Sequence, residues 1–91
     1  MGVTNQQPIL AFDVVHLGPF EEICGQLKKL HRVGGMLYVR LTVGTLEFPM
    51  NSAEAEICER ELTDKIGQRV SILSVPDVEE PIVIGLNQEQ V

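Results

Sequence analysis

The sequence has no tryptophan, one tyrosine and only two cysteines, Cys24 and Cys58. Two cysteines this far apart do not provide a disulfide framework, so we interpret them as reduced, buried thiols. With so few aromatic rings, the chain offers few platforms on which nucleic-acid bases could stack. Apolar residues make up 44% of the chain and charged residues 22%, a balance typical of globular proteins.

Long apolar runs are also missing. No window approaches the roughly eighteen apolar residues of a membrane-spanning helix, and the first residues lack a basic segment followed by an apolar one. We therefore expect no export, no membrane insertion and, by default, a cytoplasmic location. The 91 residues predict one domain over 19–86, with an N-terminal arm or added strand at 1–18 and a flexible tail at 87–91.

Motifs for catalysis or metal binding are incomplete. The chain has neither a GxxxxGK[ST] phosphate loop nor a dinucleotide-binding fingerprint. Zinc ligands usually occur in close pairs, whereas the suitable side chains here are widely spaced: His16, Cys24, His31 and Cys58. Cys24 with one of the histidines is the only nucleophile and base combination, and its apolar flank favours core packing. We expect no catalytic residue, no metal and no cofactor, and hence no enzyme.

One segment has the pattern of an amphipathic helix. Asn51 stands at a cap position with Glu54 three residues later, and Gly67 provides a stop, which predicts a helix over 52–66. Its apolar stripe is expected to contain Ala55, Cys58, Leu62 and Ile66.

Residues 36–43 alternate between apolar and polar side chains, as in a half-buried strand. Gly44 allows a tight turn, and residues 45–48 alternate again, which predicts a hairpin. Two further strands are expected over 69–75 and 81–84, because both segments are rich in β-branched residues.

The segment 20–33 fits two structures. Its apolar residues recur at helical spacing, but Gly25 sits mid-segment, and Gly34 and Gly35 before an alternating strand indicate a hairpin. As a curved strand bent at Gly25, it gives a mainly β order, β-β-β-α-β-β, with one helix between strands three and four. Over residues 20–86 this order resembles the small five-stranded OB-fold barrel, and we prefer it. As a helix, with 9–15 as a first strand, the segment gives an α+β order, βαββαβ, which resembles the ferredoxin-like sandwich.

Charge is distributed unevenly along the chain. Residues 1–45 have four basic and three acidic side chains, a net charge of +1, whereas 46–91 have three basic and ten acidic, a net charge of −7. A nucleic-acid role must therefore be local to the first half. Pairing through the Gly34 and Gly35 turn would gather a basic cluster with one ring on an outer surface: Lys28, Lys29, His31, Arg32, Tyr38 and Arg40. A lysine-rich surface that only blocks association between sheet edges has the same pattern.

The apolar N-terminal segment supports a second hypothesis. It is not needed to complete a five-stranded barrel, so it could pair with an exposed edge of another subunit through Ile9, Leu10, Phe12 and Val14. An added strand covering the chain's own core is the simpler alternative. We therefore predict a non-enzymatic binding module for single-stranded nucleic acid, or alternatively a protein adaptor or homodimeric accessory subunit.

Overall fold

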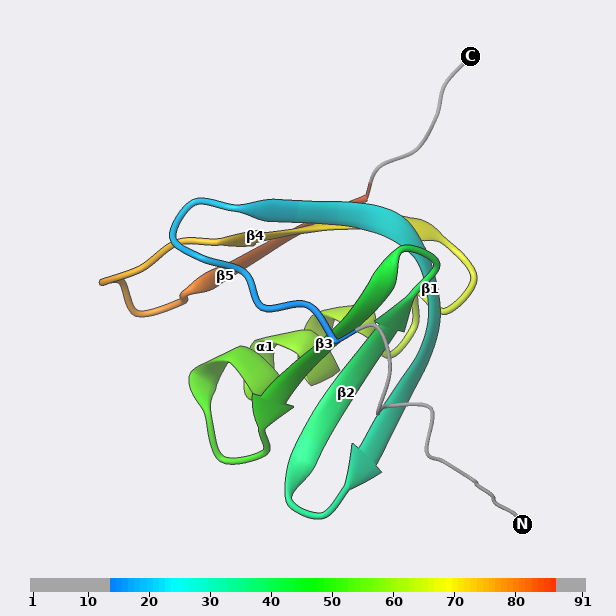
Figure 1. The fold of residues 1–91 in the computed structure, drawn as a ribbon, viewed down its shortest axis with the longest axis horizontal. Helices are drawn as coiled ribbons and strands as arrows, with labels where there is room; N and C mark the ends of the chain where they lie inside the picture. Colours follow the sequence, from blue (N-terminus) through cyan, green and yellow to red (C-terminus); the bar gives the residue numbers. More distant parts are fainter. Residues whose placement is uncertain (1–13, 87–91) are drawn as a thin grey trace, which may run out of the picture.

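The computed structural model describes residues 14–86, which form a five-stranded antiparallel sheet and one helix (Figure 1). The elements in chain order are β1 (Glu22–Val33), β2 (Met36–Leu41), β3 (Gly44–Pro49), α1 (Ala53–Leu62), β4 (Arg69–Ser74) and β5 (Ile82–Leu86). The strand order across the sheet is β3-β2-β1-β4-β5. The predicted mainly β class, with its helix between the third and fourth strands, is confirmed. Closure into a barrel is not shown, because β3 and β5 are the two edges of the sheet within the described residues.

The long strand β1 belongs to both halves of the sheet. Its first part, residues 22–26, pairs with β4, and its second part, residues 27–33, pairs with β2. The helical alternative for this segment, and with it the βαββαβ order, is therefore wrong. Gly34 and Gly35 have positive φ angles of 58° and 78°, which glycine adopts without a steric penalty, and they turn the chain directly into β2.

Gly25 was expected to mark a bend, but the irregularity in β1 lies elsewhere. The pairing register with β2 shifts between Leu27 and Lys29, which is the pattern of a β-bulge. Gly25 instead lies beneath the turn between β2 and β3. A Cβ at Gly25 would be 3.0 Å from the Thr42 hydroxyl oxygen and 3.2 Å from a methyl carbon of Val43, so close approach explains this glycine.

The helix is shorter than predicted. Its cap is Ser52 rather than Asn51, since the Ser52 hydroxyl accepts a 3.1 Å hydrogen bond from the backbone N–H of Ala55. The helix ends at Leu62, so Ile66 is not part of its apolar stripe and is half exposed. The other three predicted stripe residues are buried against the sheet: Ala55, Cys58 and Leu62.

The core lies between the sheet and α1. Its largest fully buried side chains come from four strands and the helix: Leu27, Leu37, Val39, Leu46, Leu62, Val70 and Ile72. Val15 and Leu17, which precede β1, pack against this core.

The segment before β1 runs beside β3. The Val15 N–H donates to the Thr45 carbonyl at 2.8 Å, and Val14 forms an isolated parallel bridge with Thr45. Val14, proposed above as a partner-binding residue, is thus beside a strand of its own chain. The other three residues of that hypothesis lie outside the described residues: Ile9, Leu10 and Phe12.

Candidate functional site

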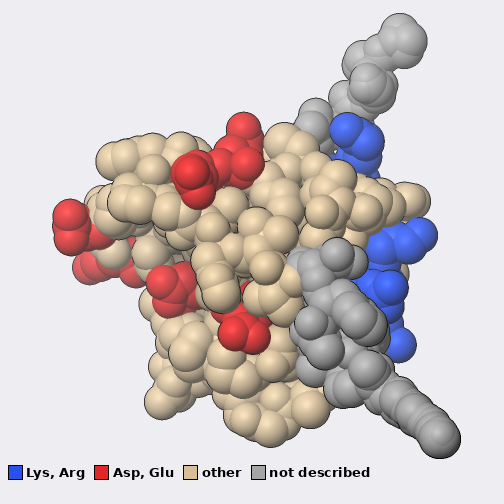
Figure 2. Space-filling model, viewed as in Figure 1, with Lys and Arg blue, Asp and Glu red and all other residues tan. Residues whose placement is uncertain are grey.

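Positive and negative side chains lie on different parts of the molecule. In Figure 2 the Lys and Arg side chains follow the right-hand edge, whereas the Asp and Glu side chains lie over the left and centre. The right-hand edge is where β1 bends and passes from β4 to β2 (Figure 1). The basic residues near this bend come from three strands, β1, β2 and β4.

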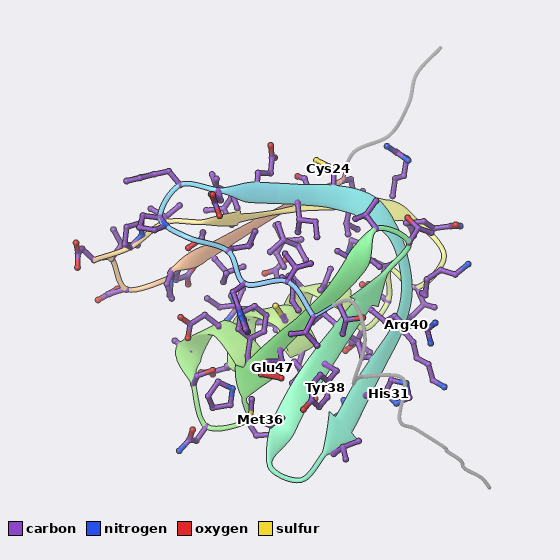
Figure 3. The ribbon with its side chains drawn as sticks, in the orientation of Figure 1. Cys24, His31, Met36, Tyr38, Arg40 and Glu47 are labelled. Carbon is purple, nitrogen blue, oxygen red and sulfur yellow. The ribbon has the colours of Figure 1, made fainter. Side chains whose placement is uncertain are left out.

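Two cross-strand pairs form the centre of the candidate site. Lys29 of β1 is opposite Arg40 of β2, and His31 is opposite Tyr38. The pair between them, Leu30 and Val39, packs in the core, so the two polar pairs point to the outer side of the sheet. Figure 3 shows His31, Tyr38 and Arg40 grouped on β1 and β2. The sequence-based prediction of these neighbours relied on the hairpin register, which the structure shows.

The bulge in β1 adds Lys28 to this side. Leu27 is buried and Leu30 packs against the core, although a spacing of three would put them on opposite faces of a regular strand. The extra residue at the register shift allows both to face inward, and Lys28 and Lys29 are both exposed between them. Two adjacent lysines thus become available on one surface.

Arg32 does not join this group. It is opposite Leu37, which is fully buried, and its guanidinium forms an ion pair with Glu59 of α1. Arg32 therefore links the end of β1 to the helix and is directed away from His31 and Lys29. The sequence-based prediction grouped it with His31 although adjacent residues of a strand alternate between faces, and pairing with Leu37 places Arg32 on the core side.

A cation missed from the sequence is Arg69. It is opposite Gln26, while the next pair, Gly25 and Val70, faces the core. Arg69 is exposed and extends the basic surface across the join between β1 and β4. Its position depends on β4 pairing with the first half of β1, for which the sequence has no local signal. We call this surface the basic face: Lys28, Lys29, His31, Tyr38, Arg40 and Arg69.

An open hollow lies within the basic face. Lys28 and Arg40 line it together with the turn formed by Thr42 and Val43. The turn is fixed against β1, because the Thr42 N–H donates to the Gln26 carbonyl at 3.0 Å and the Gln26 N–H donates to the Thr42 hydroxyl oxygen at 3.1 Å. Two cations therefore border an open hollow of about 430 Å³ whose turn is held in place against β1.

The two ring side chains of the basic face have altered proton affinities. Burial, followed by the nearby charges of Lys29 and Arg40, lowers the pKa of His31 from its usual 6.5. Its Nε2 atom is buried without a hydrogen-bond partner in the described part of the chain. Burial and the Glu47 carboxylate raise the pKa of Tyr38. At neutral pH both rings are therefore uncharged, and the positive charge comes from the lysines and arginines.

Glu47 limits the basic face on its β3 side. It is opposite Tyr38 in the β2 and β3 pairing, and its carboxylate lies 4.0 Å from Nε2 of the exposed His16. A carboxylate here disfavours a polyanion that crosses β3. The accessible path thus follows β1 and β2, from Arg69 towards Tyr38.

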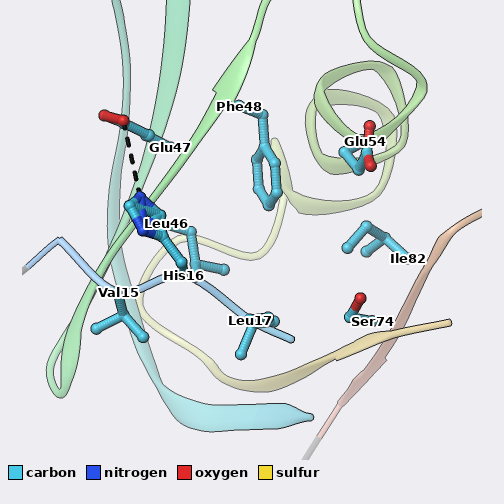
Figure 4. A pocket seen from close by; sticks show the side chains of 9 residues that line it. All are labelled: Val15, His16, Leu17, Leu46, Glu47, Phe48, Glu54, Ser74 and Ile82. Carbon is cyan, nitrogen blue, oxygen red and sulfur yellow. Dashed lines mark ion pairs between the residues drawn. The ribbon is translucent and has the colours of Figure 1, made fainter. Parts of the chain in front are cut away.

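A second hollow lies at the opposite side of β3 (Figure 4). Apolar side chains such as Leu17, Phe48 and Ile82 line it together with four polar residues: His16, Glu47, Glu54 and Ser74. Its volume of about 160 Å³ is below the roughly 300–1,000 Å³ of pockets that hold organic ligands. It separates the segment before β1 from β5 and offers little room for a substrate.

The thiols and histidines considered as metal ligands or nucleophiles do not converge. Burial, followed by the Glu54 charge, raises the pKa of Cys58 to about 12, so this thiol stays protonated in the core. Cys24 is half buried on β1 opposite Ser71. Among residues 14–86 no three His, Cys, Asp or Glu side chains form a group that could hold a metal ion.

Comparisons with known proteins add no assignment. The chain matches no protein-family model, no curated protein and no solved structure. Within the described residues no helix has the length and apolarity needed to span a membrane. The basic face is therefore the feature of the molecule that indicates a function.

Proposed function

We propose that this protein is a non-enzymatic module that binds single-stranded nucleic acid through the basic face. The observation that carries the proposal is the pair of adjacent cross-strand contacts, Lys29 with Arg40 and His31 with Tyr38. They place two cations beside a stackable ring on the outer side of one hairpin. Cationic grooves with aromatic platforms are the usual means of binding single strands without strong sequence preference.

The phosphate backbone of the bound nucleic acid would contact the cations of the basic face. Lys28 and Arg40 border the hollow beside the Thr42 turn, which would receive one phosphate. Lys29 and Arg69 would contact the phosphates on either side, since both are exposed along the same surface. Phosphate contacts provide most of the affinity and carry no sequence information, so we expect low sequence selectivity.

One base would stack on Tyr38. Because Tyr38 is the only tyrosine and the chain has no tryptophan, the proposed site holds a short stretch with one main stacking position. Neutral His31, the cross-strand neighbour of Tyr38, extends the flat surface. The carboxylate of Glu47 would repel the phosphates and keep the bound nucleic acid away from β3.

We further propose that the sheet is an open form of the OB-like barrel that its element order resembles. β1 is shared by two strand pairs, and α1 lies between β3 and β4 in the chain, as in that fold. The segment before β1 is hydrogen-bonded to β3 through Val15 and to the end of β4 through Phe20. In a closed barrel β3 would pair with β5. Here the segment before β1 connects β3 with the end of β4 instead.

The proposal is tested by fluorescence anisotropy with a labelled single-stranded oligonucleotide. Lys28→Glu combined with Arg40→Glu is expected to abolish binding, because it reverses the charge of both side chains at the hollow. Arg60→Glu combined with Lys65→Glu is the matched control. It changes the net charge equally, and in the structure both of its cations already pair with acids, Arg60 with Glu61 and Glu80, and Lys65 with Asp64. Equal loss in both variants, or unchanged binding in the first, would contradict the proposed site.

A further inference from the structure

Phe20 combines two unfavourable features. It is 69% exposed, the largest value among the exposed large apolar residues of residues 14–86. Its backbone has a φ angle of +61°, in the left-handed region where a bulky side chain is strained. Neither feature helps a folded chain in isolation, and such costs persist in proteins where a residue serves a function.

The turn that carries Phe20 is held rigidly. The Gly18 N–H donates to a Glu21 carboxylate oxygen at 2.7 Å, and the Glu21 N–H donates to the Gly18 carbonyl at 3.1 Å. The Phe20 N–H donates to the Ser74 carbonyl at 2.8 Å, which ties the turn to the end of β4. The backbone that carries the ring is thus held in place, so that binding would cost little further ordering of the turn.

The loop between β4 and β5 lies at the same end of the molecule (Figure 1). It exposes a second apolar side chain, Val78, at 52%, next to Asp77, whose φ angle is also positive at +64°. Five carboxylates surround these two apolar residues along the chain, in the turn and β1 and in the loop: Glu21, Glu22, Asp77, Glu79 and Glu80. We call Phe20, Val78 and these five residues the acidic tip. Among them Glu80 is partly neutralised by Arg60, at 3.8 Å.

We propose that the acidic tip docks a segment of a partner protein that presents an apolar face bordered by Lys and Arg. Phe20 would be the central anchor, since interface energy concentrates in buried aromatic residues. The carboxylates select a basic partner by charge complementarity, and they disfavour a symmetric contact between the tips of two copies of this chain. The tip lies at the other end of β1 from the basic face, so this docking is independent of the proposed nucleic-acid binding.

The probe is a short amphipathic helical peptide of leucine and lysine, titrated into the isotope-labelled full chain and followed by NMR. A peptide of the same composition, scrambled so that it has no apolar face, is the reference ligand. We expect chemical-shift changes confined to the turn around Phe20 and the loop around Val78. Phe20→Asn should weaken binding about 30-fold, the loss typical of a central aromatic anchor.

Asparagine tolerates the left-handed backbone better than phenylalanine, so Phe20→Asn should keep or raise the Tm. Ile66→Asn is the matched control, because Ile66 is 49% exposed in the loop that leads into the other end of β4. The Ile66→Asn variant should bind the peptide as tightly as the unmodified protein. A lower Tm for Phe20→Asn would show that the ring serves stability and would overturn the proposal. Equal binding of the scrambled peptide, or shifts centred on α1, would overturn it too. So would self-association that Phe20→Asn abolishes, because a second copy would then be the occupant.

Discussion

Replacing Lys29 and Arg40 together by alanine removes one of the two central pairs of the basic face, and salt dependence measures that loss. The face holds four permanent cations: Lys28, Lys29, Arg40 and Arg69. If each neutralises one phosphate of a single strand, the slope of log affinity against log salt is about −2.8. Affinity then falls about 50-fold between about 50 mM and about 200 mM salt. With two cations left, the slope is about −1.4 and the same change of salt costs about 7-fold.

The assay is anisotropy of a labelled oligonucleotide at four or more salt concentrations. The matched control is Arg60→Ala with Lys65→Ala, which changes net charge identically away from the basic face and should keep the original slope. The slope counts ions released and does not depend on the absolute affinity, so it separates contact from general electrostatic attraction. Identical slopes for the two double variants would refute the assignment of phosphate contacts to the basic face.

Four other predictions test single features. Tyr38→Ala should cost about 1–3 kcal/mol of oligonucleotide affinity, while Tyr38→Phe keeps it, because stacking requires only the ring; the same anisotropy assay decides. Since burial and neighbouring cations lower the pKa of His31 from 6.5, the unfolded chain is protonated first as the pH falls. Stability should therefore be lost below about pH 6.5, down to the lowered pKa, and His31→Gln should remove this contribution from urea unfolding curves. Gly25→Ala should lower the free energy of unfolding by about 1–3 kcal/mol, because the new Cβ would press on the turn above it. Cys58, with its pKa raised to about 12, should resist alkylation at neutral pH in the native protein and react only on unfolding, as read by mass spectrometry.

The elements that could be predicted from the sequence are those with local signals. The hairpin of β2 and β3 follows from alternation and a short turn, and both strands appear within two residues of the expected bounds. The helix follows from its apolar spacing, but its ends depended on competing caps. Ser52 rather than Asn51 accepts from the first turn, and Gly67, despite its positive φ of 92°, lies beyond the helix end at Leu62. Residue type alone does not decide between Asn51 and Ser52 as the cap, since asparagine and serine are both good N-caps.

The residues of the candidate site were harder to predict, because membership of a face depends on long-range pairing. Arg69 joins the basic face only through the pairing of Gln26 with β4, a contact that has no counterpart in the local sequence. Arg32 is excluded by alternation alone, because the register of the hairpin pairs it with the buried Leu37, and its ion pair with Glu59 of α1 lies on that side. By contrast, the opposition of His31 and Tyr38 follows from counting outward from the glycine turn.

The same feature made β1 ambiguous in the sequence and builds the candidate site in the structure. Leu27 and Leu30 are three residues apart, a spacing that suits one face of a helix and is wrong for one face of a regular strand. The bulge resolves the conflict by adding one residue, so both leucines reach the core without a helix. That added residue is also the reason why Lys28 and Lys29 are exposed together, beside Arg40. The bulge therefore explains the helical spacing of Leu27 and Leu30, and it concentrates positive charge where β1 bends between its two partner strands.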